Sequence, residues 1–231
     1  VDNYRTAARY EGQVRGIAAA FREDRTTTGV FAQARGAVGD LDVSGGLRHD
    51  FSRFTGAGGQ EIDTEGTSAN VDVSWAATPE LSFNGGLSSV FGGTQLASVY
   101  ELDSPFLLER AYDALNPTRA HNAVLGAEWR RGGTTLGAEL FRTRIDDIRK
   151  GLVSRDLESE GFRLSARQDW QGGFAALRYS DTDVTLDGAP ASSFDLRELG
   201  TVPGGMLTLE ARHEVMAGLS LGGIVQHAIE E

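Results

Sequence analysis

The side chains best able to do chemistry form one charged group near the middle of the chain. The group has three acids and three bases: Glu139, Asp146, Asp147, Arg142, Arg144 and Arg149. Paired carboxylates can serve as a general acid and a general base. Here an arginine lies within a few positions of every acid, which favours a solvated network of ion pairs. We therefore predict no catalytic site in this group.

The other reactive residue types show no catalytic or metal-binding pattern. The four histidines, His49, His121, His213 and His227, lack the spacing of a zinc-binding pair. No serine lies in a GxSxG nucleophile elbow, because the one GxSxG sequence, Gly218 to Gly222, belongs to an alternating apolar strand and not to a strand-to-helix turn. The chain has no cysteine, which excludes thiolate metal sites and a disulfide scaffold. We expect a protein that is not an enzyme and that has no resident cofactor or metal.

A long connection, Gly92 to Ala120, is the strongest candidate for binding. It has about thirty residues, whereas connections in compact domains usually have about four to six, and loops of that length are usually functional. Its candidate ligand-binding residues are Tyr100, Glu101, Asp103, Phe106, Arg110 and Tyr112. The alternative is that these side chains are ordinary surface groups or pack within the loop.

The overall charge argues against one class of partner. The net charge is −11, so little basic surface is available to neutralise phosphates and we expect no nucleic-acid partner. The same charge could attract cationic or metal-bearing ligands, or it could serve solubility alone. Glycine is abundant, at 30 residues, and proline is scarce, at 5, which indicates many turns.

The elements that would position these residues are β-strands. From Asp40 to Phe51, apolar and polar residues alternate strictly, with Leu41, Val43 and Leu47 on one face. That run is longer than a usual strand of about five to six residues and suits a tilted membrane-spanning strand. Nearer the N-terminus we expect two separate strands, Arg15 to Glu23 and Thr27 to Ala37.

Short turns and long loops alternate along the chain between about eleven expected strands. The short turns are Val38-Gly39, Ala76 to Pro79, Arg131 to Gly133, Gln171 to Gly173 and Met216 to Gly218. Transmembrane β-barrels have this asymmetry, with short turns on one side of the membrane and long loops on the other. Trp75, Trp129 and Trp170 all lie beside short turns, where an aromatic girdle would place them.

Several segments, in order, resemble the barrel of TonB-dependent outer-membrane receptors. Gly29 to Arg48 is similar to a family hairpin that ends in GxRxD, here Gly46 to Asp50. Further similar segments are Tyr100 to Leu102, Leu115 to Asn122, Leu140 to Ile148 and Ser159 to Phe162. The phenylalanine–arginine–alanine–proline box of the family departs from its pattern here, because Gly92-Gly93 follows Phe91.

The resemblance implies an all-β fold, an antiparallel transmembrane β-barrel segment with about eleven strands of a roughly 22-stranded barrel. It implies that residues 1–231 form the C-terminal half of the barrel, incomplete, with the plug domain and the final strands absent. The N-terminus lacks signal-peptide character and a Met, which also suggests a segment of a longer protein. An open half-barrel has unpaired edges, so we expect the isolated piece not to be a working unit.

The resemblance also implies a function. We expect an active transporter in a Gram-negative-type outer membrane that takes up iron–siderophore ligands. Its partners would be outer-membrane lipid and an inner-membrane TonB complex that acts through the plug. Haem-type members carry a histidine between the two boxes, and residues 93–115 contain none, which disfavours haem. A haem receptor, a passive porin-like channel and a soluble all-β binding module are the alternatives.

Overall fold

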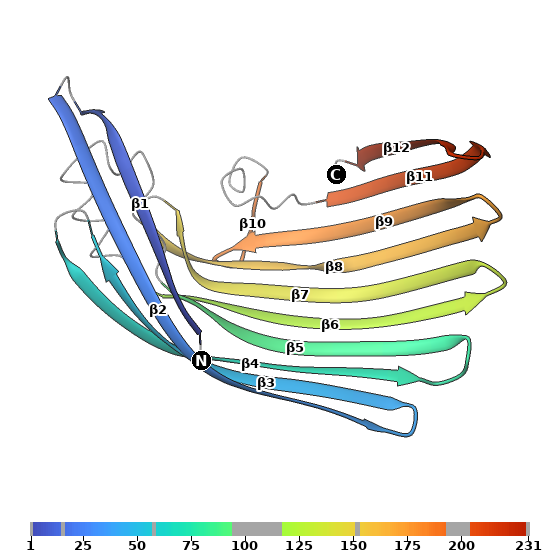
Figure 1. Ribbon diagram of the computed structural model, residues 1–231, viewed down its shortest axis with the longest axis horizontal. Coiled ribbons are helices and arrows are strands. Elements are labelled where there is room, and N and C mark those ends of the chain that lie inside the picture. The colour runs from blue at the N-terminus through green and yellow to red at the C-terminus, as the bar shows by residue number, and fades with distance from the viewer. Residues whose placement is uncertain are drawn as a thin grey trace.

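The computed structural model describes residues 2–14, 17–56, 59–93, 117–150, 153–192 and 204–229, which form one antiparallel sheet (Figure 1). Its long strands are β1 (Asp2–Val14), β2 (Ile17–Val38), β3 (Leu41–Thr55), β4 (Glu61–Ala76), β5 (Leu81–Gly93), β6 (Thr118–Arg131), β7 (Thr134–Lys150), β8 (Val153–Trp170), β9 (Gly173–Leu186), β11 (Gly204–Met216) and β12 (Leu219–Ile229). The short β10 (Ala189–Pro190) pairs only with β9. Each long strand pairs with its neighbours in sequence, which confirms the predicted antiparallel barrel wall of eleven long strands.

The N-terminal part of the sheet differs from the sequence prediction. Arg15 to Glu23 and Thr27 to Ala37 do not form two strands, because residues 17–38 form the single strand β2, and Asp2–Val14 forms the unpredicted β1. The pairing explains the continuity: β2 pairs with β1 as far as Gly29, and its pairing with β3 already begins at Asp24. Every residue from Asp24 to Gly29 is therefore paired with a neighbouring strand on both sides, although this polar segment interrupts the alternation of apolar and polar residues.

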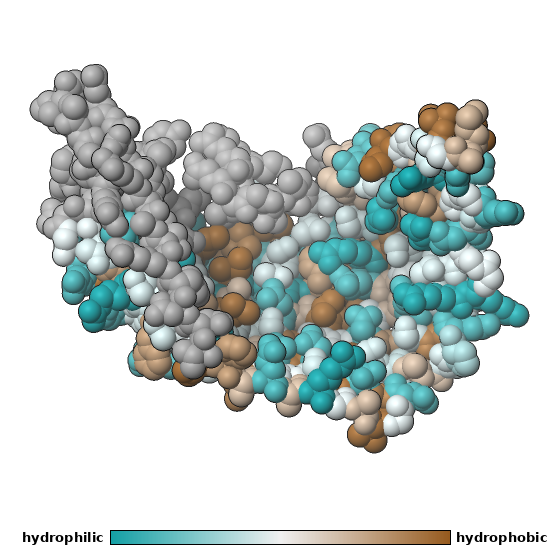
Figure 2. Space-filling view, viewed as in Figure 1, coloured by the Kyte–Doolittle hydropathy of each residue, from teal (hydrophilic) through white to brown (hydrophobic). Residues whose placement is uncertain are grey.

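The turns β2–β3, β4–β5, β6–β7, β8–β9 and β11–β12 all lie at one end of the sheet, which we call the turn end (Figure 1). The opposite end is the loop end, and it also has short connections, since β7 and β8 remain paired as far as Lys150 and Val153. Hydrophilic side chains gather toward the turn end (Figure 2). The β6–β7 turn consists of Gly132 and Gly133, with φ of 57° and 82°. Two positive φ angles match a type I′ turn, whose twist fits a hairpin and which favours glycine at both positions.

The register divides the side chains between two faces. One face, the outer face, is apolar along whole rows of cross-strand neighbours. One such row runs through Trp75, Phe83, Ala127, Ala138, Leu164, Tyr179 and Leu207. Leu47, Leu87, Leu125 and Leu140 of this face are about 60% exposed. A band of exposed leucines over many strands requires an apolar surrounding such as lipid.

The apolar band of the outer face ends along a diagonal. One row of cross-strand neighbours begins with the apolar residues Val71, Leu87 and Ala123. On the next two strands the same row contains Arg142, which is two residues beyond Leu140 on β7, and Glu160 on β8. The band therefore stops earlier on β7 and β8 than on β4 and β5. Strands in membrane barrels tilt by about 35–45°, so a row across them changes its depth in the bilayer. The diagonal is the expected trace of a flat membrane boundary on tilted strands.

Beyond this boundary the two faces exchange character. The outer face carries charges, whereas the opposite face carries a buried apolar cluster of Ile148, Leu157, Val184 and Leu186. Ile145 and Ala191 pack against that cluster, and the Ala191 amide donates to the Val184 carbonyl, which holds the chain after β10 against β9. Beyond the part of the sheet that contacts lipid, the charged outer face is exposed to water, and the apolar side chains of the opposite face form a small core.

Two edges of the sheet have no strand beside them in the described residues, at β1 and at β12. Every residue of β12 is exposed. Within the described parts of the chain, no helix is both long enough and apolar enough to cross a membrane.

Candidate functional site

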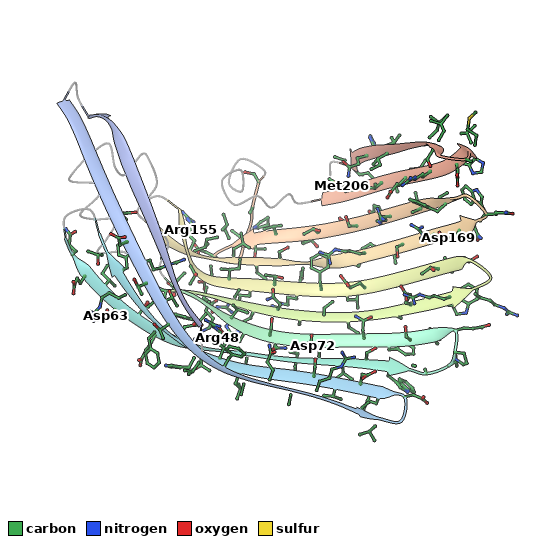
Figure 3. The ribbon with its side chains drawn as sticks, viewed as in Figure 1. Arg48, Asp63, Asp72, Arg155, Asp169 and Met206 are labelled. Carbon is green, nitrogen blue, oxygen red and sulfur yellow. The ribbon has the colours of Figure 1, made fainter. Side chains whose placement is uncertain are left out.

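The face opposite the apolar band, the lumenal face, is polar along most of its length. Figure 3 shows where Arg48, Asp72, Asp169 and Met206 of this face lie along the strands. The register places nine polar side chains of the alternating strands on this face: Asp42, Arg48, Asn70, Asp72, Asn84, Glu128, Arg163, Arg167 and Asp169. In a membrane barrel this face lines the interior.

Hydrogen bonds tie the lumenal polar groups together across strands. Asn122 on β6 donates from Nδ2 to the Ser88 hydroxyl on β5 at 3.1 Å. On its other side, Thr143 of β7 donates to Asn122 Oδ1 at 2.9 Å. One amide side chain thus bridges three strands, which fixes its orientation toward the interior.

A well-buried ion pair of the lumenal face lies on β3. Arg48 donates from Nε to both carboxylate oxygens of Asp50 at 2.9 Å, and Nη2 lies 2.7 Å from Oδ1. Asp50 is 6% exposed, so the pair is shielded from water. Gly29 lies opposite Asp50 on β2, and a Cβ there would stand 2.2 Å from Arg48 Nη2. The missing side chain of Gly29 is what makes room for this pair.

A hollow of about 430 Å³ lies on the lumenal face between β5 and β11, with Glu139, Arg163 and Arg178 in its lining. Arg163 forms an ion pair with Glu139 and lies 4.2 Å from the centre of the Phe141 ring. Arg178 donates to Glu210 at 3.2 Å. These contacts hold alternating charges in fixed positions on the wall, a surface suited to a polar occupant.

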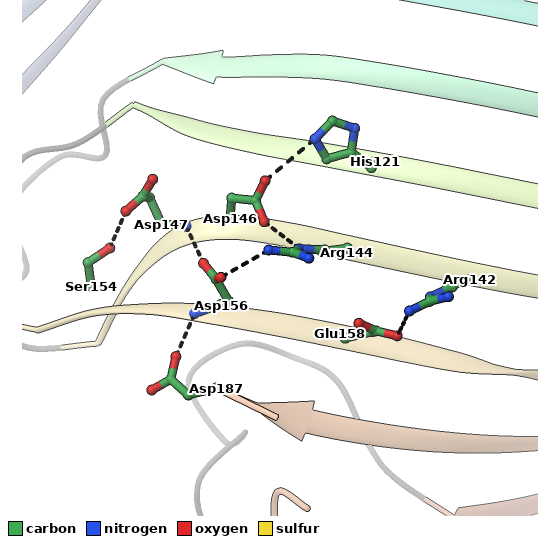
Figure 4. A network of polar contacts seen from close by, with 9 residues as sticks. All are labelled: His121, Arg142, Arg144, Asp146, Asp147, Ser154, Asp156, Glu158 and Asp187. Atoms are coloured by element: carbon green, nitrogen blue, oxygen red, sulfur yellow. Dashed lines mark hydrogen bonds and ion pairs between the residues drawn. The ribbon is translucent and has the colours of Figure 1, made fainter. Parts of the chain in front are cut away.

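The three acids singled out in the sequence do not meet. Glu139 belongs to the lumenal face, whereas Asp146 lies at the loop end on the outer face, paired with Arg119. The prediction of ion pairs is correct for Glu139, which pairs with Arg163, and for Arg142, Arg144 and Asp146, whereas the side chain of Arg149 lies outside the described residues. Arg142 pairs with Glu158, and Arg144 pairs with Asp146 at 2.6 Å and with Asp156 at 3.2 Å (Figure 4).

This network also fixes the irregular backbone at the loop end. Asp147 and Asp187 have φ of 58° and 52°, in the left-handed region that aspartate tolerates. Asp156 binds both segments, since its Oδ1 accepts from the Asp147 amide and its own amide donates to Asp187 Oδ1 (Figure 4). Ser154 donates to Asp147 Oδ1 at 2.8 Å. The contacts join β7, β8 and β9, and hydrogen bonding to Asp146 raises the pKa of Arg144.

The predicted ligand-binding residues Tyr100, Glu101, Asp103, Phe106, Arg110 and Tyr112 lie outside the described residues, so their role stays a prediction. Among the described residues, no group of three His, Asp or Glu side chains could hold a metal ion. All four histidines have outer-face register positions, with His213 toward the turn end and His227 on the edge strand. No histidine of this chain therefore belongs to the lumenal face.

Comparison with known proteins decides the family. The family model described as TonB dependent receptor-like, beta-barrel matches residues 2–222. The chain belongs to this family. Among curated proteins it is similar to the haem transporters BhuA of Brucella ovis and Brucella abortus, with 26% identity over 172 residues, which cover 70% of this chain. The match covers 26% of those proteins, so the chain spans about a quarter of their length.

Solved structures of TonB-dependent receptors share the fold. The FrpB iron transporter from Neisseria meningitidis superposes with a TM-score of 0.72 and 16% identity, over 90% of this chain and 34% of that one. The ferric yersiniabactin uptake receptor FyuA from Yersinia pestis superposes with a TM-score of 0.62 and 13% sequence identity, over 91% of this chain and 35% of that one. The resemblance and the barrel fold predicted from the sequence are thus confirmed. The absence of a plug domain and of final strands stays a prediction.

Sequence reasoning missed two features of the site. Arg178 and Glu210 were not singled out, because neither belongs to a segment that resembles the family, although both occupy polar positions in alternating strands that could have indicated them. The role of Gly29 was missed because the sequence shows no sign of which glycine faces an ion pair. Only the register of β2 against β3 reveals it.

Proposed function

We propose that this chain forms part of the barrel wall of an outer-membrane receptor that imports an iron chelate, driven by a TonB-type complex of the inner membrane. The loop end is extracellular and the turn end is periplasmic. The observation that supports this most is the division of one sheet into an apolar outer band and a polar lumenal face with fixed ion pairs. The role is transport, with no catalysis by the chain itself.

Within this proposal, a ferric siderophore is the first choice of ligand. Many such chelates are polar and bear charges of both signs, which suits a wall where Glu139 and Glu210 alternate with Arg163 and Arg178. Haem would be bound best by a histidine that reaches its iron from the interior. Each of the four histidines has an outer-face position, so this part of the wall supplies no such ligand.

Haem is the second candidate, favoured by the BhuA proteins, whose names state haem transport. In that case the iron ligands would come from parts of the full-length protein outside this chain. Binding by the purified full-length protein separates the two candidates. We expect ferric siderophores to bind and to displace each other, and haemin to show no shift of its absorption band. A shifted haem band with no siderophore binding would replace the first choice with the second.

A passive porin-like channel is the remaining alternative. It predicts uptake that is proportional to ligand concentration and insensitive to the inner-membrane gradient. Membership of the TonB-dependent receptor family argues against it, because the match extends over residues 2–222.

A further inference from the structure

A groove of about 670 Å³ lies on the outer face at the upper edge of the apolar band. It crosses from β4 to β7 over two neighbouring rows. The first row contributes Val71, Leu87 and Ala123, and the second contributes Ala69 and Ser89. Ala69, Ser89 and Ala123 have small side chains, whereas the larger side chains of Leu47 and Leu125 beside them project from the sheet. The small side chains therefore form the floor of the groove between the larger ones.

The wall of the groove on β6 and β7 is lined by basic side chains, whose carboxylate partners lie outside the lining. Both rows of the floor run into it, since Ala123 pairs with Arg142 and His121 pairs with Arg144. Arg142, Arg144 and His121 are part of the lining, whereas no carboxylate is. The side chains of the two arginines are 60% and 52% exposed, so a ligand can reach them.

Carboxylates beside the groove hold these arginines in place. Glu158 and Glu160 of β8 bind Arg142 at Nη2 and Nε, and Arg144 is bound at Nε by Asp146 of β7 and at Nη2 by Asp156 of β8. A guanidinium has five N–H donors, and in the described contacts Nη1 of both arginines has no partner. The arginines therefore keep donors for a second acceptor without having to reorganise.

We propose that this groove binds one phosphate-bearing lipid of the outer leaflet. Its acyl chain lies over Val71, Leu87 and Ala123, and its phosphate accepts from Arg142 and Arg144. Two observations favour a lipid over another occupant: the floor is continuous with the apolar band, and the two arginines with unused donors lie where that band ends. Guanidinium groups bind phosphate by paired, charge-assisted hydrogen bonds, which supplies the charge complementarity.

The proposal depends on membrane insertion of the barrel and not on the identity of the transported ligand. The test uses the full-length protein in dodecyl maltoside, with native mass spectrometry after addition of dioleoylphosphatidylglycerol. Dioleoylphosphatidylcholine has the same chains with a zwitterionic headgroup, and inorganic phosphate is an anion without chains. We expect phosphatidylglycerol to remain bound about tenfold more than phosphatidylcholine, and phosphate not to displace it.

Two variants and one control localise the site. Arg142→Gln with Arg144→Gln should lower phosphatidylglycerol retention about tenfold, and Ala123→Trp, which fills the floor, should lower retention of both lipids. The control, Arg163→Gln with Arg178→Gln, removes the same charge from ion-paired arginines of the lumenal face and should leave retention unchanged. The gel mobility of unheated samples shows which variants are folded. Equal retention by the folded Arg142/Arg144 variant and the control, or displacement by phosphate, would overturn the proposal.

If the lipid fails to bind while the full-length protein still imports its ligand, only this inference fails. If the lipid binds and no energy-dependent import occurs, the transport proposal fails and this one stands.

Discussion

At the scale of single residues, Gly29 has the clearest structural role. Gly29→Ala would place a Cβ 2.2 Å from Arg48 Nη2 and 2.5 Å from Asp50 Oδ1, so the buried ion pair has to shift. We expect the free energy of unfolding to fall by about 1–3 kcal/mol, the range for crowding a packed site. Urea unfolding of the full-length protein in lipid vesicles measures this.

The control for this prediction lies on the same strand. A Cβ added to Gly36 of β2 would have nothing within 4 Å, so Gly36→Ala should leave the unfolding free energy nearly unchanged. Equal effects of the two substitutions would show that loss of glycine in β2, and not displacement of the Arg48–Asp50 pair, is responsible.

A second residue-scale prediction concerns pH. Arg53 lies beyond the apolar band and donates to both oxygens of Asp63, at 2.8 and 3.0 Å, which lowers the pKa of Asp63. A lowered folded-state pKa stabilises the protein above the unfolded pKa, and that stabilisation is lost as the pH falls through the folded value.

Asp63→Asn should therefore reduce stability at neutral pH and lose its effect in acid, below the folded pKa of Asp63. Parallel unfolding of the wild type and the variant at neutral pH and in strong acid measures the difference. A difference that is the same under both conditions would contradict the assigned ion pair.

At the scale of elements, the apolar cluster at the loop end joins β7, β8 and β9. Leu157 is 3% exposed at its centre, so Leu157→Ala should cost about 2–4 kcal/mol for a buried cavity. We expect faster hydrogen exchange of the Ala191 amide, which donates to Val184 beside the cluster. Val153→Ala on the same strand removes an exposed side chain and serves as the control. Unchanged exchange at Ala191 in the Leu157 variant would show that the cluster does not hold β10.

The elements near the turn end could be predicted from the sequence, and those near the loop end could not. Around Gly132-Gly133, both flanking strands alternate cleanly, because lipid on one side and water on the other impose a period of two. Beyond Arg142 that constraint ends, and polar residues such as those of Arg22 to Thr26 remain in strands through pairing alone. The bulge between Ile145 and Ile148 and the network around Asp156 depend on contacts between strands that periodicity does not reveal.

At the scale of the whole molecule, the apolar band defines which face meets lipid. Leu125 is 59% exposed in this band, midway along β6 between Trp129 and His121, so Leu125→Arg should cost about 2–4 kcal/mol in a bilayer, the range for arginine near the midplane. Ser82→Arg places the same charge on the lumenal face, opposite Glu128, and should cost about 0.5 kcal/mol, as surface changes do. Folding of the full-length variants into vesicles measures both. A reversed order would mean that the two faces have been assigned the wrong way round.

The family and the barrel wall could be recognised from the sequence because motifs and alternation both depend on short segments. The polar lumenal surface could not, because it combines side chains that lie far apart in the sequence on neighbouring strands, such as Asn122 with Ser88 and Thr143. The predicted binding residues of the long connection, Tyr100 to Tyr112, stay a prediction for the same reason: no periodic pattern fixes where a loop side chain points.

The central claim is energy-driven import, and uptake by cells measures it most directly. The full-length gene product is expressed in iron-starved cells, and uptake of a labelled ferric siderophore is followed with and without collapse of the proton gradient. We predict uptake that stops when the gradient collapses. Uptake that persists without the gradient would contradict an energised receptor and indicate a passive channel.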